Sequence, residues 1–436
     1  MMNKLLKSNR IKGTVKIVVT NCWSYYNKGD AAITLATARL IHKVAPNAEI
    51  TLLAFDYRSF AKHRKDLGDF VKVLPMPSIT DSLRPIRILF SLASCVGLKG
   101  VFGSLFLMLS LASTYLLRHI DRTLDCTLRS IDDSDLVIVV GGNYIYSHFG
   151  FYIHAIPIAY AKFVRKKKTI MLGHSIGPFE DTISRIISRI ILSHIDLIVF
   201  REELSHSYVK ENLKINLPNT LISGDMTFFL QAPEVTCERF ESQPRVGITA
   251  RKWLFNRPDL YERYLDSIMQ TAFNLIRDGF EIYVIPFSYV EGGENDLEPC
   301  RAIYNKISDK YPKEVHLIDV KEESPTSLVK VMKNLRLHVL IGTRMHSVLI
   351  ASLAGVPSVI ISYQHFKAHG ISKQLGLHNY VINIENMKPD KLMRYVNKLI
   401  KNHEKERKNL TMAVQRFKKI DELRINSILS SLMSAN

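Results

Sequence analysis

The sequence predicts an α/β protein in which short buried strands alternate with helices. Short apolar runs rich in Val, Ile and Leu are the pattern of strands that are covered on both faces, as in parallel sheets. Between these runs, apolar residues recur at helical spacing, and a strand–helix–strand order indicates parallel crossover connections. The pattern occurs in two successive sets, separated by a polar stretch at 231–245 that contains Pro233 and Pro244.

The first set supplies the predicted N-terminal domain. Its predicted strands are Val15–Thr20, Ile50–Ala54, Leu136–Val140, Thr169–Gly173, Leu197–Phe200 and Thr220–Ser223. Its predicted helices are Asp30–Val44, Ile153–Val164, Ile183–Leu192 and Glu202–Asn212. Elements in this order form a parallel sheet with helices on both faces.

The second set supplies the predicted C-terminal domain. Its predicted strands are Val246–Ala250, Glu281–Pro286, Val315–Ile318, Leu335–Ile341 and Ser358–Ser362. Its predicted helices are Leu260–Asp278, Leu297–Ser308, Ser324–Asn334 and one that follows Ser347 and ends near Gly355. We therefore expect two Rossmann-like domains, 1–232 and 245–385, that face each other across a central cleft, and a basic helical tail at 386–436.

An apolar insert, Ile86–Leu117, interrupts the first set. Arg84, Arg87, Lys99 and Arg118 bracket it, and glycines near its middle are expected to break it into two pieces. A membrane-spanning helix needs about 20 apolar residues. The sequence leaves three interpretations open: buried or interdomain helices, peripheral insertion into one membrane leaflet, or a true span. In the second case the basic flanks would meet anionic headgroups.

Composition narrows the function classes. The formal net charge is +18 over 436 residues, which favours acidic partners. Nucleic acid is disfavoured, because no zinc-finger or aromatic RNA-binding signature accompanies the charge. Five scattered cysteines without a Cys-x-x-Cys pair indicate reduced thiols and no metal site. The N-terminal residues lack the apolar core of a signal peptide, so we expect a cytoplasmic protein.

Familiar cofactor motifs are missing from the sequence. No Gly-x-Gly-x-x-Gly follows the first predicted strand, and no P-loop or Gly-x-Ser-x-Gly elbow occurs. Dinucleotide redox chemistry, ATP hydrolysis and α/β-hydrolase chemistry are therefore disfavoured.

The most informative stretch is Leu-Ile-Gly-Thr-Arg-Met-His-Ser at 340–347. It follows a predicted strand and opens a helix, so Arg344 and His346 lie at the carboxyl end of a strand, where open α/β sheets bind ligands. A helix N-terminus favours anions, and an Arg can grip a carboxylate or phosphate in a forked geometry. The stretch predicts a site for a small anion beside a titratable histidine.

Other polar residues also follow predicted strands. In the first set these are Arg201, His174 and the turn Gly141-Gly142-Asn143; in the second they are Arg251 and Lys367. Those of the first set have purely structural alternatives: an ordinary glycine turn, a structural histidine, and, for Arg201, an exposed ion pair with the two glutamates that follow it.

Two further predicted loops contain residues that could contact a ligand or a metal ion. In Asn21–Asp30, Gly29 permits a tight backbone and Asp30 is a natural helix N-cap, which can be its whole role. The acidic loop 291–296 lacks the ligand spacing of an EF-hand, so we expect it to be solvated.

The chain resembles the polysaccharide pyruvyl transferase family at a series of motifs between about Ile17 and Leu377. In chain order these are 27–33 (Asn-Lys-Gly-Asp-Ala-Ala-Ile), 141–143 (Gly-Gly-Asn), 173–178 (Gly-His-Ser-Ile-Gly-Pro), Arg201 with Ser205, 224–225 (Gly-Asp), 343–347 (Thr-Arg-Met-His-Ser), 354–357 (Ala-Gly-Val-Pro), Lys367 and 375–377 (Leu-Gly-Leu). Their order and spacing together make the match specific. The family commonly has a third glycine where Asn143 stands and often Gln where His174 stands.

The resemblance implies a fold similar to GT-B glycosyltransferases and an enzyme that takes phosphoenolpyruvate as donor, with no other cofactor. It also implies that pyruvate is attached as a ketal to two hydroxyls of a sugar, in a surface polysaccharide or its lipid-linked precursor. By the family pattern, Arg201, Arg344 and His346 would bind the donor in the cleft, with Arg201 contributed by the first domain.

The chemistry of this reaction suggests roles for the candidate residues. Protonation of the donor's methylene carbon needs a general acid, and His346 is the candidate. Arg344 and Arg201 would clamp carboxylate and phosphate, and Asp30 would orient an acceptor hydroxyl. The remaining candidates for substrate contacts are Asn27, Gly142, Asn143, His174, Arg251 and Lys367.

Two other functions remain open at this point. One is a GT-B-type glycosyltransferase with a nucleotide-sugar donor, which would use a similar cleft. The other is a non-catalytic membrane-associated scaffold that depends on the apolar insert. The sequence does not identify the acceptor sugar, and it leaves a homo-oligomer open.

Overall fold

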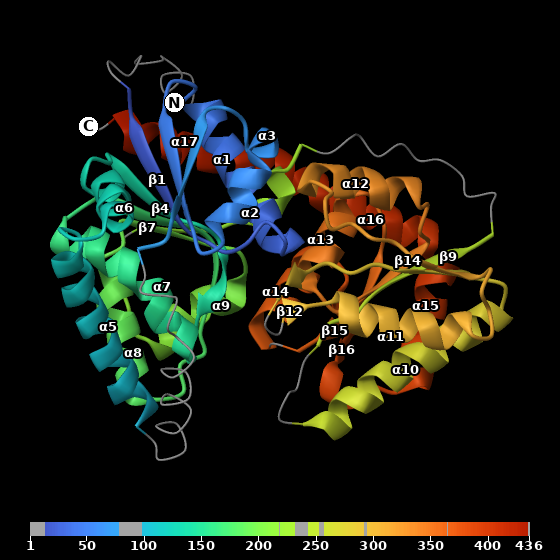
Figure 1. Ribbon diagram of the computed structural model, residues 1–436. Helices are drawn as coiled ribbons and strands as arrows, with labels where there is room; N and C mark the ends of the chain where they lie inside the picture. The colour runs from blue at the N-terminus through green and yellow to red at the C-terminus, as the bar shows by residue number, and fades with distance from the viewer. Residues whose placement is uncertain are drawn as a thin grey trace. The chain divides into compact units, whose positions relative to one another are not determined.

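The computed structural model describes residues 14–77, 98–217, 219–231, 243–252, 257–291, 294–363 and 365–434. The chain divides into two compact units (Figure 1). Unit 1 contains Met1–Trp23, Thr37–Ser223 and Ile420–Asn436, and unit 2 contains Ser24–Ala36 and Gly224–Lys419. Each unit is built around one parallel sheet with helices packed against it, as the alternation of apolar runs predicts.

The sheet of unit 1 has the strand order β3-β2-β1-β4-β6-β7-β8, and β5 also pairs with β6. All of these pairs are parallel. The strands are β1 (Lys16–Cys22), β2 (Glu49–Ala54), β3 (Val71–Pro75), β4 (Leu136–Val139), β5 (Gly142–Ile145), β6 (Thr169–Ile176), β7 (Leu197–Phe200) and β8 (Thr220–Ile222). β4, β6 and β7 are buried along their whole length, which explains the unbroken apolar sequences of β4 and β7.

The connections of unit 1 are mostly helical. Its helices are α2 (Tyr57–Lys62), α3 (Arg64–Leu67), α5 (Lys99–Leu117), α6 (Arg122–Asp132), α7 (Phe149–Ala159), α8 (Thr182–Ser193), α9 (Glu203–Ser207) and α17 (Glu422–Ser434), with π-helical turns at Tyr160–Val164 and Tyr208–Asn212. Helix α1 (Lys28–Val44) begins in unit 2 and ends in unit 1. The C-terminal α17 lies beside the strands of unit 1, where the Lys168 ammonium donates to the Leu432 carbonyl at 2.9 Å (Figure 1).

The sheet of unit 2 has the strand order β13-β10-β9-β14-β15-β16, again all parallel. The strands are β9 (Arg245–Thr249), β10 (Glu281–Val284), β13 (Val315–Leu317), β14 (Val339–Gly342), β15 (Ser358–Ser362) and β16 (Val381–Asn383), and a separate hairpin joins β11 (Tyr289–Val290) to β12 (Glu294–Asn295). The helices are α10 (Pro258–Arg277), α11 (Leu297–Ser308), α12 (Pro325–Asn334), α13 (Met345–Leu353), α14 (His365–Gln374), α15 (Pro389–Lys401) and α16 (His403–Arg416), with 3-10 turns at Met226–Phe229, His378–Tyr380 and Ile384–Asn386 and a π-helical turn at Phe417–Asp421.

The units are divided differently from the predicted domains. Segment 24–36, expected in the N-terminal domain, belongs to unit 2. Lys28 explains this placement: its backbone N–H donates to the Phe287 carbonyl at 3.0 Å, and its fully buried ammonium donates to the carbonyls of Lys321 and Glu323 at 2.6 and 2.9 Å. Likewise the tail is not a separate part, since it belongs to unit 2 as far as Lys419 and to unit 1 from Ile420.

The apolar insert differs from its prediction. Residues 99–117 form one continuous helix, α5, which contains Gly100 and Gly103. These glycines do not break the helix; they bring it close to its neighbours, because a Cβ at Gly103 would lie 2.1 Å from the Tyr152 ring and one at Gly100 would lie 2.2 Å from an Asp181 oxygen. The first piece of the insert, 86–97, lies outside the described residues.

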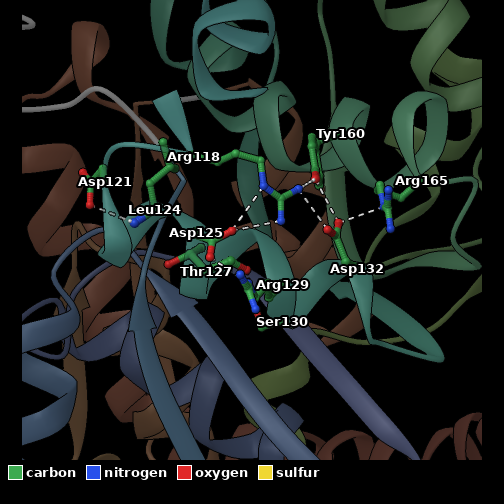
Figure 2. A network of polar contacts seen from close by, with 10 residues as sticks. All are labelled: Arg118, Asp121, Leu124, Asp125, Thr127, Arg129, Ser130, Asp132, Tyr160 and Arg165. Atoms are coloured by element: carbon green, nitrogen blue, oxygen red, sulfur yellow. Dashed lines mark hydrogen bonds and ion pairs between the residues drawn. The ribbon is translucent and has the colours of Figure 1, made fainter. Parts of the chain in front are cut away.

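A polar network fixes the C-terminal end of α5 (Figure 2). The Arg118 guanidinium, directly after the helix, contacts Asp125 and Asp132 at 3.0 Å and donates to the Tyr160 hydroxyl at 3.2 Å. Asp132 in turn accepts from Tyr160 and pairs with Arg165. The network joins α5 to α6 and to the turn after α7, so this end of the helix is held within unit 1.

Candidate functional site

The carboxyl ends of three neighbouring strands form the candidate site of unit 2. β14 lies between β9 and β15, and the residues just beyond these strands are Arg251, Thr343 and Tyr363. A hydroxyl network fixes this edge: the Tyr264 hydroxyl bonds to that of Thr343 at 2.8 Å, and the Thr249 hydroxyl bonds to that of Ser347 at 2.9 Å. The sheet therefore presents a rigid edge where the sequence predicts a ligand site.

Arg344 is held by a buried carboxylate. Its Nε and Nη2 atoms lie 2.7 and 2.9 Å from the two oxygens of Asp296, and the side chains are 8% and 1% exposed. This is the bidentate geometry in which Arg–carboxylate pairs are strongest. The prediction that loop 291–296 is solvated is wrong at Asp296, because β11 and β12 fold the loop back and bury this residue.

His346 lies in the first turn of α13 and faces a second buried carboxylate. Its Nε2 is 3.6 Å from Oδ2 of Asp225, and the side chains are 10% and 0% exposed. The other Asp225 oxygen accepts from the Thr227 N–H at 2.9 Å, which fixes the carboxylate. A carboxylate at this distance is placed to orient the imidazole and to stabilise positive charge on it.

Gly29 packs its backbone against the His346 ring. A Cβ on Gly29 would lie 2.1 Å from Nδ1 of His346, so any side chain would displace the imidazole. Asn27 acts as the helix cap here, because its Oδ1 accepts from the Gly29 N–H at 3.2 Å. The predicted cap, Asp30, is instead in the first turn of α1, because the helix begins at Lys28.

A hollow at the same edge is lined by residues beyond β14 and β15, including Thr343, Met345, Tyr363 and Lys367. The sequence predicts that Lys367 lies in the loop after Ser362, but the structure has it in helix α14. The Arg251 guanidinium stacks on the Tyr363 ring, 4.4 Å from its centroid. Cationic side chains from two elements thus lie at this edge, as an anionic ligand requires.

The candidate residues of unit 1 form a separate buried cluster. Nε2 of His174 lies 3.0 Å from the Tyr144 hydroxyl, and Nε of Arg201 donates to the Ser175 hydroxyl at 2.6 Å. Arg201 is fully buried, so its structural alternative, an exposed ion pair, is wrong. Gly142 and Asn143 belong to strand β5 rather than to a turn, with Gly142 in register with His174.

Burial keeps the histidines of this cluster neutral. It lowers the pKa of His174 to about 3, with the charge of Arg201 as the second cause, and lowers that of His148 to about 4. Burial also holds the pKa of His154 well below its ordinary range. A neutral imidazole can either donate a hydrogen bond to a hydroxyl or accept one from it, which is consistent with the contact between His174 and Tyr144.

The structure brings some of the predicted residues together but not all in one cluster. Asn27, Arg251, Arg344, His346 and Lys367 belong to unit 2, as does Asp30. Gly142, Asn143, His174 and Arg201 belong to unit 1. A site in which Arg201, Arg344 and His346 bind the same donor molecule would need residues from both units. That site stays a prediction.

Sequence reasoning missed Asp225 and Asp296 as partners of the site. Asp225 follows a predicted strand in a Gly-Asp pair, which was a usable signal. Asp296 had none, since it is one of several acids in a polar loop. Among the described residues, no group of three or more His, Cys, Asp or Glu could hold a metal ion.

We expect Asp296→Ala to lower the free energy of unfolding by about 3–5 kcal/mol, because it leaves the buried Arg344 guanidinium without this carboxylate. Denaturant unfolding of the variant and parent measures the difference. Glu298→Ala is the matched control: it removes an exposed pair with Lys252 and should cost less than about 1 kcal/mol. Equal costs for the two variants would contradict the structural role of Asp296.

We expect stability to fall as the pH drops below 6.5, the ordinary pKa of histidine. Between that value and the lowered pKa values in the fold, the unfolded chain binds more protons, so acid favours unfolding. Each fully buried neutral histidine contributes roughly 1 kcal/mol per pH unit in this window. Melting curves at a series of pH values should show a shallower decline for His174→Gln, whereas the exposed control His194→Gln should keep the parent slope.

Comparison with known sequences gives one family. The family described as polysaccharide pyruvyl transferase matches residues 27–365, which is most of the chain. The amylovoran biosynthesis protein AmsJ of Erwinia amylovora is 25% identical over 301 residues, covering 64% of this chain and 69% of AmsJ. The matched range includes all of the predicted site residues apart from Lys367.

Comparison with solved structures supports the fold. HepE of Anabaena, solved with UDP-glucose, has a TM-score of 0.57 at 11% identity, covering 96% of this chain and 99% of HepE. UDP-GlcNAc 2-epimerase of Neisseria meningitidis, bound to UDP-GlcNAc, has a TM-score of 0.55 at 12% identity, covering 94% and 99%. The predicted α/β class with two Rossmann-like sheets, similar to GT-B enzymes, is confirmed. From the family match over residues 27–365, the chain belongs to the polysaccharide pyruvyl transferase family.

Proposed function

We propose that this enzyme transfers the pyruvyl unit of phosphoenolpyruvate onto a sugar of a surface polysaccharide or its lipid-linked precursor, and forms a pyruvate ketal. Family membership supports pyruvyl transfer, and AmsJ, by its name, serves in amylovoran biosynthesis. The observation that carries the proposal is His346 beside the buried Asp225 at a strand end that also holds cationic side chains.

In the proposed mechanism His346 is the general acid. It gives its proton to the methylene carbon of phosphoenolpyruvate, and the positive charge that develops at C2 is captured by a sugar hydroxyl, whose proton is released. Phosphate then leaves, and a second hydroxyl closes the ketal. One donor and two hydroxyls therefore yield one ketal and one phosphate.

The neighbouring residues support this step in different ways. Asp225 orients the imidazole and stabilises its charged form, while Gly29 leaves room for the ring. Arg251 and Lys367 provide cations for the donor's carboxylate and phosphate, and Arg344, whose charge is balanced by Asp296, is proposed to donate hydrogen bonds to the donor at the N-terminus of α13. Asp30 is proposed to orient an acceptor hydroxyl.

The proposed reaction requires no further cofactor, since the donor carries its own leaving group and every step is a proton transfer or the addition or loss of an oxygen group at C2. Phosphoenolpyruvate is a cytoplasmic compound, so we place the enzyme in the cytoplasm. The cluster of unit 1 around His174 and Tyr144 contains groups that can donate and accept hydrogen bonds, and we propose that it serves the saccharide acceptor.

The donor is tested by ligand-induced thermal stabilisation. At a concentration one hundredfold above its dissociation constant, phosphoenolpyruvate should add about 2.7 kcal/mol to the stability of the folded protein, and UDP-glucose should add none. Stabilisation by UDP-glucose and not by phosphoenolpyruvate would instead favour a nucleotide-sugar glycosyltransferase.

The general acid is tested by glycan analysis. We expect His346→Ala to keep the stabilisation by phosphoenolpyruvate but to lower transfer at least about 100-fold, the usual contribution of a positioned acid. Mass spectrometry of the glycan from cells that carry this allele should lack the added mass of one pyruvate less one water per repeat. His369→Ala, an exposed histidine in α14 of the same unit, is the control and should leave the glycan unchanged. A pyruvylated glycan in the His346→Ala cells would remove this residue from the mechanism.

A further inference from the structure

Helix α5 presents a continuous apolar face to solvent. Five of its exposed apolar side chains are adjacent or lie three, four or seven residues apart, spacings that place them on one side of the helix. They are Val101, Leu105, Met108, Leu109 and Leu116, and the exposed fraction reaches 67% at Met108 and 69% at Leu109. Soluble surfaces rarely carry so many large apolar side chains together, and such patches mark interaction sites.

The opposite face of α5 is packed within unit 1. Helix α5 lies against α7 and α8 (Figure 1), and its inward residues Gly103, Leu107, Ser110 and Thr114 are buried. By length and composition alone α5 is sufficient to cross a membrane, and 28% of its most apolar window is buried. A lipid-surrounded span would have to break this packing and the Arg118 network at its end (Figure 2), so contact through one face is favoured over a span.

Helix α8 packs beside α5 and also presents apolar and cationic side chains to solvent. Ile186 and Ile190 are half exposed, and Arg185 and Arg189 are exposed beside them. Neither α5 nor α8 contains an Asp or Glu, and two acids near the C-terminal end of α5, Asp125 and Asp132, are paired with Arg118. We use "the α5–α8 face" for these five exposed apolar side chains of α5 together with Arg185, Ile186, Arg189 and Ile190.

From these observations we propose that the α5–α8 face binds the surface of an anionic phospholipid membrane. Its apolar side chains enter the boundary between headgroups and acyl chains, while the two arginines contact the anionic headgroups. A protein partner or a second copy of this chain would have to match a wide apolar strip that is bordered by arginines, while the nearby exposed Glu180 is paired with Lys99 at 2.7 Å. A fluid anionic surface meets both requirements at once.

The test is co-sedimentation of the full chain with phosphatidylcholine vesicles, with and without phosphatidylglycerol. We expect binding that needs the anionic lipid and weakens as salt is added, because screening acts on exposed charges. Arg185→Gln and Arg189→Gln should each weaken binding about fivefold, the effect of one basic residue near an anionic surface.

The apolar contribution is tested separately. Met108→Glu with Leu109→Glu should reduce binding more than about tenfold, since each would otherwise insert an apolar side chain. Met412→Glu is the matched control, because Met412 is 61% exposed on α16 and lies outside the face. Unchanged melting temperatures would show that the variants fold, as expected for exposed positions.

Two results would overturn the proposal. One is absence of vesicle binding by the parent protein at low salt. The other is a dimer that the Met108→Glu, Leu109→Glu variant abolishes while vesicle binding persists, which would assign the α5–α8 face to a second copy of the chain. Neither result bears on pyruvyl transfer, because no residue of this face belongs to the proposed active site.

Discussion

The contact between the backbone of Gly29 and the imidazole of His346 is the constraint on which the site of unit 2 depends. Only a residue without a Cβ can occupy position 29, since the ring lies where a side chain would begin. The contact holds because Lys28 anchors the start of α1 to the carbonyls of Lys321 and Glu323. The short motif at 27–30 is therefore part of the histidine's surroundings, although more than three hundred residues separate them along the chain.

Four buried charged residues near the candidate site of unit 2 have partners that fix their side chains. Lys28 is compensated by backbone carbonyls, Arg344 by Asp296, and Asp225 by the Thr227 N–H and the nearby His346. Desolvating a charge costs several kcal/mol unless such partners are present. These partners fix the side chains at this edge, as the proposed general acid would need in order to meet a carbon atom at a fixed distance.

The sequence predicts the fold well because strands buried on both faces are unbroken apolar runs, and each predicted strand is present within a few residues. The prediction fails where the local preference of a residue differs from the conformation that tertiary contacts impose on it. β5 begins with Gly142 and Asn143, which favour turns, and pairing with β6 overrides that preference. The Asn27–Gly29 motif and Asp296 reach His346 and Arg344 only through tertiary folding, so neither periodicity nor spacing indicates those contacts.

The likeness to UDP-sugar enzymes concerns the scaffold, and the side chains decide the chemistry. At 11 to 12% identity those structures share two parallel sheets with this chain, and one architecture hosts many reactions. In nucleotide-sugar transfer the nucleoside diphosphate leaves, and no proton is delivered to a carbon atom. The proposed transfer from phosphoenolpyruvate begins with protonation of a carbon atom. The imidazole of His346 lies beside the buried Asp225 carboxylate, and the cation of Arg251 stacks on a ring at the same edge. This arrangement suits the protonation step. The arrangement of the site therefore suits the proton transfer to carbon that we propose.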